Sequence, residues 1–138
     1  MATAPVPRLP DAHPTPRANH AKGVALEVSI QKALGALPGV AILRNAVISV
    51  TTQTGRTLLT GIGGVGAPDL HVEVRTPSGV FASVWMECKA GGSRKRPAQA
   101  AWHEAARRLG RHVYVVRTVE EAVRIVEAFQ RGEVPDGE

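Results

Sequence analysis

The sequence predicts an α/β fold in which helices flank a mixed central β-sheet, in the order helix, three strands (or four), helix, strand, helix. Apolar and polar residues alternate with period two at 70–75 and at 80–89, which indicates two half-buried strands. The turn sequence Thr76-Pro77-Ser78-Gly79 joins these strands as a hairpin. A helical segment separates the second strand from an apolar strand at 112–117, so these two strands are expected to be parallel and joined by a right-handed crossover.

The first helix is expected from Lys22 to Leu37. Apolar residues recur there at helical spacing, and Pro38-Gly39 ends the pattern. Glu27 lies at the border of this apolar face, where a carboxylate can reach toward the surface on which the helix packs. The preceding residues 1–20 are rich in proline and alanine and are expected to form a flexible arm.

A strand is predicted at 40–50, interrupted by Arg44-Asn45, because β-branched and apolar residues dominate this stretch. A turn at 51–55 and a short strand at 56–60 follow. Glycine then recurs up to Pro68-Asp69, at positions 61, 63, 64 and 66.

Two further helices complete the chain. Pro97 suits a first helical turn, and Gly110 caps the end of that helix. The last helix begins at Thr118 with a Ser/Thr-x-x-Glu capping box that ends at Glu121. We therefore expect one domain over residues 21–131, followed by an acidic tail at 132–138.

Composition excludes several classes of protein. A chain of 138 residues with 43% hydrophobic residues can bury a core of its own. The single cysteine, Cys88, excludes an internal disulfide and fits a reducing compartment. Neither a membrane-spanning apolar run nor the apolar segment of a secretory signal is present, so a cytoplasmic location in a bacterial or phage-infected cell is expected. The net charge of +5 favours a polyanionic partner, although solubility alone explains such a charge about as well.

The predicted hairpin places the Asp69 end of its first strand beside the Glu87 end of its second. Glu87 and Lys89 lie on one face of that strand, since side chains two residues apart point the same way. Two carboxylates this close repel each other unless a cation lies between them. Mg²⁺ accepts two carboxylates, a backbone carbonyl and waters, and the carbonyl of Cys88 is available to it. A metal held here would activate water against a phosphodiester, with Lys89 orienting the nucleophile or neutralising charge. Strand-edge charges without chemistry are the alternative.

The ordered set Gly66-Ala67-Pro68-Asp69, Glu87-Cys88-Lys89 and Gln99 resembles the PD-(D/E)XK nucleases, and within them the virus-type replication-repair nuclease (VRR-NUC) domain. The resemblance covers most of residues 24–129 and implies a restriction-endonuclease-like core. It implies that Asp69, Glu87 and the Cys88 carbonyl bind Mg²⁺ or Mn²⁺, that Lys89 assists the attacking water, and that Gln99 positions the lysine or a phosphate. Glu27 would match the glutamate of the first helix, which contacts the metal directly or through water. Arg96 departs from the family pattern, where a small hydroxyl residue is common before Pro97.

The resemblance also implies a homodimer that cuts branched or flapped DNA, with phage or host replication and repair proteins as further partners. The basic residues Arg94, Lys95 and Arg96 follow the metal-site strand and are expected to contact flanking phosphates. Arg44 and Asn45 are weaker candidates for DNA contact, and a structural asparagine in a bulge is an equally good interpretation.

Three other interpretations of the sequence are less favoured. The pattern Gly61-x-Gly63-x-x-Gly66 matches a dinucleotide fingerprint, but an alternating strand follows it where a helix is required. A non-catalytic DNA-binding module of the same fold is disfavoured because Asp69, Glu87 and Lys89 are all present. A sequence-specific restriction enzyme would need a recognition domain for which the chain looks too short.

Overall fold

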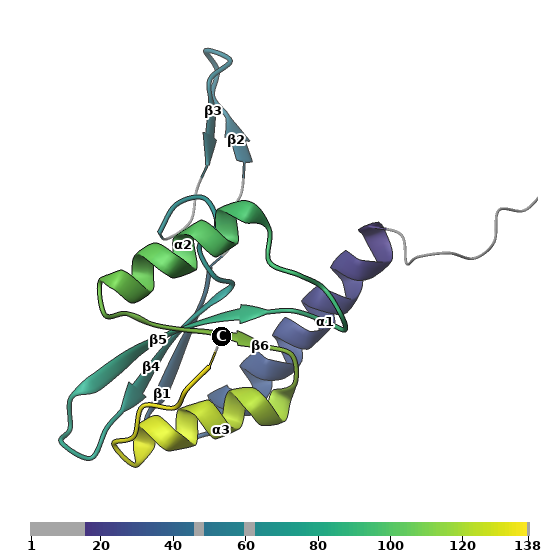
Figure 1. Cartoon of the computed structure of the whole chain (residues 1–138). Helices are drawn as coiled ribbons and strands as arrows, with labels where there is room; N and C mark the ends of the chain where they lie inside the picture. Colours follow the sequence, from purple (N-terminus) through teal and green to yellow (C-terminus); the bar gives the residue numbers. More distant parts are fainter. Residues whose placement is uncertain (1–15, 46–48, 60–62, 138) are drawn as a thin grey trace, which may run out of the picture.

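The computed structural model describes residues 16–45, 49–59 and 63–137 as a four-stranded sheet between helices, together with a separate two-stranded hairpin (Figure 1). The predicted arm at 1–15 and residue 138 of the predicted tail lie outside the described residues. No helix in the described part of the chain is long and apolar enough to cross a membrane. The elements are α1 (Pro16–Gly35), β1 (Val40–Arg44), β2 (Ser49–Thr51), β3 (Thr57–Leu59), β4 (Leu70–Arg75), β5 (Phe81–Cys88), α2 (Pro97–Arg108), β6 (His112–Val116) and α3 (Val119–Gln130).

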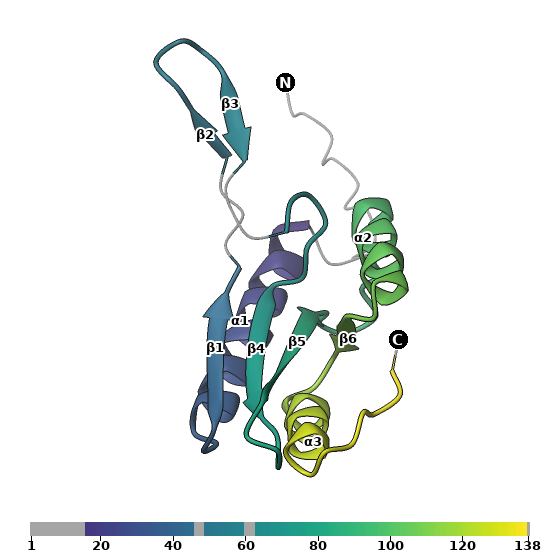
Figure 2. The ribbon, with the colours of Figure 1, turned by 90° about the vertical axis from the view of Figure 1, so that its left-hand side faces the viewer.

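The main sheet is mixed, as predicted, with the strand order β1-β4-β5-β6. The pairs β1/β4 and β4/β5 are antiparallel, whereas β5/β6 is parallel and is connected through α2. Figure 2 shows the strands side by side, from β1 at one edge to β6 at the other. The carboxyl end of β5 therefore lies in the middle of the sheet, between β4 and β6.

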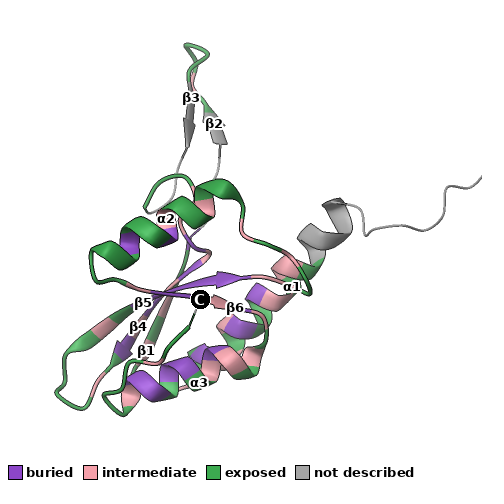
Figure 3. Ribbon diagram, in the orientation of Figure 1, coloured by how far each residue is buried: buried purple, intermediate pink, exposed green. Residues whose placement is uncertain are grey.

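The helices form two layers because alternate residues of β5 point to opposite faces of the sheet. On one face, Met86 packs in a core with Ile30 of α1 and Phe129 of α3. On the other face, Trp85 packs against Ala106 of α2. Buried residues accordingly follow the strands and the inner sides of α1 and α3 (Figure 3). The result is a helix–sheet–helix sandwich whose sheet is enclosed where β5 ends.

The predicted cap of the last helix is present in a shifted form. Thr118 Oγ1 accepts a hydrogen bond of 3.1 Å from the backbone N–H of Glu121. The Glu121 carboxylate accepts from the backbone N–H of Arg117 at 2.9 Å, one residue earlier than in a standard capping box. Arg117 is thereby held at the junction of β6 and α3.

The N-terminal half differs from the sequence prediction at two places. α1 begins at Pro16, so residues 16–20 of the predicted arm are helical. The predicted interruption at Arg44-Asn45 is present, but the part of the strand after it belongs to a separate sheet, where β2 pairs with β3 as the hairpin that projects from the body in Figure 1. The split has a physical cause, because the buried side chain of Asn45 donates to the Pro68 carbonyl at 3.0 Å and takes the chain out of the β1 ladder.

Gly66 permits a close contact between the approach to β4 and the start of α2. Its φ is +87°, and a Cβ at this position would overlap the carbonyl oxygen of Ala98. Gly64 has a similar φ of +80°, but a Cβ there would meet nothing within 4 Å. The two glycines therefore share the same backbone requirement and differ only in packing.

We predict that Gly66→Ala lowers the free energy of unfolding by about 1–3 kcal/mol more than Gly64→Ala does. Both variants carry the cost of a positive φ, roughly 1–2 kcal/mol, but only the first also overpacks against a helix backbone. Urea unfolding of the two variants measures the difference. Equal destabilisation would show that α2 moves away at no cost.

Candidate active site

The register of the β4–β5 hairpin brings Asp69 and Glu87 together. Leu70 pairs with Met86 in this antiparallel ladder. Asp69, which precedes Leu70, therefore lies opposite Glu87, which follows Met86. The backbone N–H of Cys88 donates to Asp69 Oδ2 at 2.8 Å, which fixes the aspartate against the end of β5. Asp69, Glu87, Cys88 and Glu27 line one cavity of about 130 Å³, together with Gly23 and Val24 of α1. The predicted juxtaposition of the two acids is confirmed.

Gln99 links the acid and the lysine of β5. Its Nε2 donates to Glu87 Oε1 at 2.6 Å, and its Oε1 accepts from Lys89 Nζ at 2.8 Å. Lys89 Nζ also lies 3.5 Å from Glu87 Oε1. The same Gln99 oxygen accepts from the backbone N–H of Arg96 at 2.8 Å, so this glutamine both caps α2 and orients two site residues. Gln99 thus lies beside the lysine that the resemblance implied it positions. Its bond to the Arg96 N–H caps the start of α2, where the Arg96 side chain has no acceptor to offer.

Burial dominates the electrostatics of the site. It raises the pKa of Glu87 to about 8, helped by the negative charge of Asp69. Burial also raises the pKa of Asp69, although the Cys88 N–H and the Lys89 charge act in the opposite direction. The pKa of the Cys88 thiol is raised by burial and by the neighbouring acids, so this sulfur stays protonated and is no nucleophile.

The donor set fits a hard divalent cation. Glu87 Oε2 is buried and has no hydrogen-bond partner, which leaves one carboxylate oxygen for a ligand inside the cavity. Within the described ranges, no three His, Cys, Asp or Glu side chains form a complete metal-binding group. Two acids with a backbone carbonyl and waters match Mg²⁺, which keeps several waters in its coordination sphere. Asp69, Glu87 and the Cys88 carbonyl are thus the residues that would hold it.

Glu27 lies at the cavity but is engaged by an arginine. Its carboxylate Oε1 is 2.8 Å from Arg44 Nε, and the two side chains are 11% and 57% exposed, respectively. The last residue of β1 therefore reaches across to α1. The Arg44 side chain is thus largely open to solvent, whereas that of Glu27 is buried at the cavity.

Asn45 requires a correction, because its side chain is buried and is not placed to contact DNA. Its Nδ2 donates to the Pro68 carbonyl, and its backbone N–H donates to the Asp69 carbonyl at 2.7 Å. Asn45 therefore fixes the turn that positions Asp69, which agrees with the interpretation of Asn45 as a structural asparagine. A polar residue that interrupts an apolar strand was the available sequence signal.

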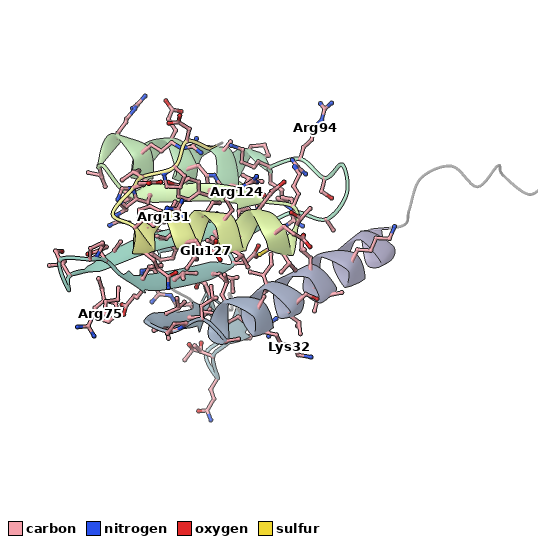
Figure 4. The ribbon with its side chains drawn as sticks, turned by 90° about the horizontal axis from the view of Figure 1, so that it is seen from below. Lys32, Arg75, Arg94, Arg124, Glu127 and Arg131 are labelled. Carbon is pink, nitrogen blue, oxygen red and sulfur yellow. The ribbon has the colours of Figure 1, made fainter. Side chains whose placement is uncertain are left out.

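The basic loop between β5 and α2 is anchored by Arg117, a residue that no sequence pattern predicted. Arg117 Nη1 donates to the carbonyls of Gly91 and Ser93, at 3.1 and 2.8 Å. Arg94 and Arg96 are exposed on this loop and Lys95 is partly exposed. Figure 4 shows the Arg94 side chain extending outward from the loop. No local sequence pattern indicates this role of Arg117, because its partners are carbonyls more than twenty residues away in the chain.

The glycine-rich approach packs on α2 and leads into no helix of its own. Trp102 Nε1 donates to the Gly63 carbonyl at 2.7 Å, and its ring lies 5.2 Å from that of Trp85. Gly66 leads directly into the turn before β4, so the glycine pattern is followed by a strand and not by the helix that the fingerprint requires. The structure therefore gives the glycine pattern a packing role against α2.

Together, a mixed sheet with flanking helices and an aspartate, glutamate and lysine gathered at the end of its hairpin define a nuclease domain of the PD-(D/E)XK type. A solved structure described as a "VRR_NUC domain" is similar to this chain, with a TM-score of 0.52 and 26% sequence identity, covering 78% of this chain and 97% of that one. No protein-family model and no curated protein matches the sequence. The likeness in fold and sequence over most of both chains supports assignment of this chain to the VRR-NUC family.

The raised pKa of Glu87 predicts an unusual pH dependence of stability. Because the folded-state value of about 8 exceeds the ordinary 4.5, the folded protein keeps a proton that the unfolded chain loses between these values. This contribution is complete below about pH 4.5 and is lost as the pH rises to about 8. In chelator, the melting temperature should fall by several degrees across this window, at roughly 3–5 °C per kcal/mol. Thermal unfolding measures it.

Glu87→Gln is the matched control, because it keeps the shape of the side chain and removes the titration. The downward slope between pH 5 and 8 should flatten in this variant, and the parent chain should regain stability at pH 8 when Mg²⁺ is added. A parent chain whose stability is flat or rises over this window would contradict the assignment of a protonated Glu87.

Proposed function

We propose that the chain is a Mg²⁺- or Mn²⁺-dependent endonuclease that hydrolyses phosphodiester bonds in DNA. The observation that carries the proposal is the hydrogen-bonded set at the end of β5. There Glu87 keeps one buried oxygen without a partner, and Gln99 holds both Glu87 and Lys89. A buried acid pair and an oriented ammonium have no evident value for stability, because burying charge is costly.

Each residue has a distinct part in the proposed reaction. Asp69 and Glu87 would hold the cation, which when bound lowers the pKa of a water and polarises the scissile phosphate. Lys89, fixed at 2.8 Å from Gln99 Oε1, would orient the attacking water or offset negative charge that develops on the phosphate. Gln99 would act through Glu87 and Lys89, by keeping the lysine beside the glutamate.

The family and the surface of the chain support a narrower proposal. We infer that the substrate is branched, flapped or junction DNA, that the active form is a homodimer, and that phage or host replication and repair proteins deliver the substrate in the cytoplasm. The solvent-facing cations on the anchored loop would hold phosphates beside the cut site. A panel of labelled duplex, flap, splayed-arm, four-way-junction and single-stranded DNA tests this selectivity directly.

Asp69→Asn and Glu87→Gln should each reduce Mg²⁺-dependent cleavage by roughly 100- to 1,000-fold or more. A metal contribution of several kcal/mol, at 1.36 kcal/mol for each factor of ten, sets this scale. Rates of cleavage on the best substrate of the panel measure the loss, and circular dichroism checks that the fold persists. Near-parental activity in either variant would refute the metal assignment and favour a non-catalytic DNA-binding module.

Neutralising Arg94, Lys95 and Arg96 should weaken DNA binding and flatten its dependence on salt. Each phosphate that the variant no longer neutralises should lower the slope of log affinity against log salt by about 0.9 for duplex DNA. The matched control replaces Arg75 at the end of β4, Arg124 on α3 and Arg131 at the C-cap of α3, and removes the same charge (Figure 4). Equal effects of the two triple variants would show that only net charge matters.

A further inference from the structure

Glu27 lies between two cations, one that is part of the protein and one that the proposed site would bind. Its carboxylate lines the same cavity as Asp69 and Glu87. It is also paired with Arg44 at 2.8 Å. Since a carboxylate oxygen held by a guanidinium is less available to a metal, Arg44 and a divalent cation compete for this one side chain.

The two members of the pair differ in their surroundings. The side chain of Glu27 is only 11% exposed, whereas that of Arg44 is 57% exposed. A carboxylate this buried is stabilised by positive charge close to it, so any loosening of Arg44 favours a cation in the cavity. The exposed guanidinium, in contrast, is accessible to an external anion.

Arg44 also has capacity for a phosphate before it leaves Glu27. The bond to Glu27 uses Nε, so the terminal edge of Nη1 and Nη2 is not part of this bond. A guanidinium binds phosphate through paired N–H groups, and its terminal edge offers such a pair. A DNA phosphate could therefore be engaged first at that edge and would then weaken the hold on Glu27.

The end of β1 connects this pair to the metal site. Arg44 precedes Asn45, whose backbone N–H and side chain are bound to the Asp69 and Pro68 carbonyls. Arg44 is itself opposite Leu70 in the β1–β4 ladder. A phosphate that reaches Arg44 therefore lies beside the residues that would hold the metal.

We propose that Arg44 is a positioning residue that makes metal binding depend on DNA. In the free protein Arg44 holds Glu27. When DNA binds, a backbone phosphate replaces Glu27 as the partner of Arg44, and Glu27 turns to the metal site. This inference rests on the proposed function. By linkage, the metal and DNA each raise the affinity for the other by the same factor.

The first test titrates Mn²⁺ into the full chain without DNA and compares the parent with Arg44→Ala, Glu27→Gln and the double variant. Arg44→Ala should bind Mn²⁺ about fivefold or more tightly than the parent, because the guanidinium no longer competes with the cation for the Glu27 carboxylate. In the Glu27→Gln background the same substitution should change affinity by less than about twofold. Thermal unfolding confirms that each variant is folded.

Two results would overturn the inference. Arg44→Ala with parental Mn²⁺ affinity would show that no competition exists. Equal tightening in both backgrounds would show that Arg44 acts only through its charge. Glu87→Gln separates this inference from the proposed function: if Mn²⁺ binding does not need Glu87, the nuclease proposal fails, whereas binding that needs Glu87 but ignores Arg44 overturns the competition alone.

The second test measures the reciprocal effect on DNA, with Ca²⁺ as a hard cation and a gel to confirm that the duplex stays intact. In Glu87→Gln, the effect of Ca²⁺ on DNA affinity measures only the screening of DNA by the cation. In the parent, Ca²⁺ should increase DNA affinity by a factor that exceeds this effect about fivefold or more. The excess should disappear in both Arg44→Ala and Glu27→Gln. If Glu27→Gln keeps the full excess, Glu27 is an anchor for Arg44 and no metal ligand, and the proposal is wrong.

Discussion

The burial of the Glu87 carboxylate beside Asp69 is the constraint on which the rest of the site depends. Two acids at the end of a hairpin, inside a sandwich of helices, have raised pKa values and leave one oxygen of Glu87 without a partner. Such an arrangement costs stability unless a proton or a cation resolves it. Gln99 satisfies the other oxygen and ties it to Lys89, so the charges are placed in a fixed order around one cavity.

The supports of this pair come from separate parts of the chain. Asn45 holds the turn before β4, and the Cys88 N–H holds Asp69 against β5. Gln99 approaches from α2 on one side, while α1 brings Glu27 to the cavity from the other. Arg117 fixes the basic loop from the carboxyl end of β6, which lies beside the carboxyl end of β5. The residues that would hold the metal ion are thus fixed by several hydrogen bonds, whereas the exposed basic side chains lie on the loop between β5 and α2.

The ion pair of Glu27 with Arg44 affects how the site would bind a metal ion in the absence of DNA. In the free protein the Arg44 charge stabilises the buried Glu27 carboxylate, which then needs no bound cation. The pair also keeps Arg44 at the surface next to the cavity. A site with this pair would be assembled in full only on DNA. That property would limit the capture of metal by the free protein.

Much of this protein was determined by local sequence. Period-two alternation and the turn at 76–79 specified the β4–β5 hairpin, and its register alone brought Asp69 opposite Glu87 and put Lys89 on the same side, because side-chain direction in a strand depends only on parity. Other features were decided by tertiary structure. The pairing of Glu27 with Arg44, the burial of Asn45 and the anchoring of the basic loop by Arg117 join residues 17 to 26 positions apart. Such contacts depend on how the layers pack, and no local pattern encodes them.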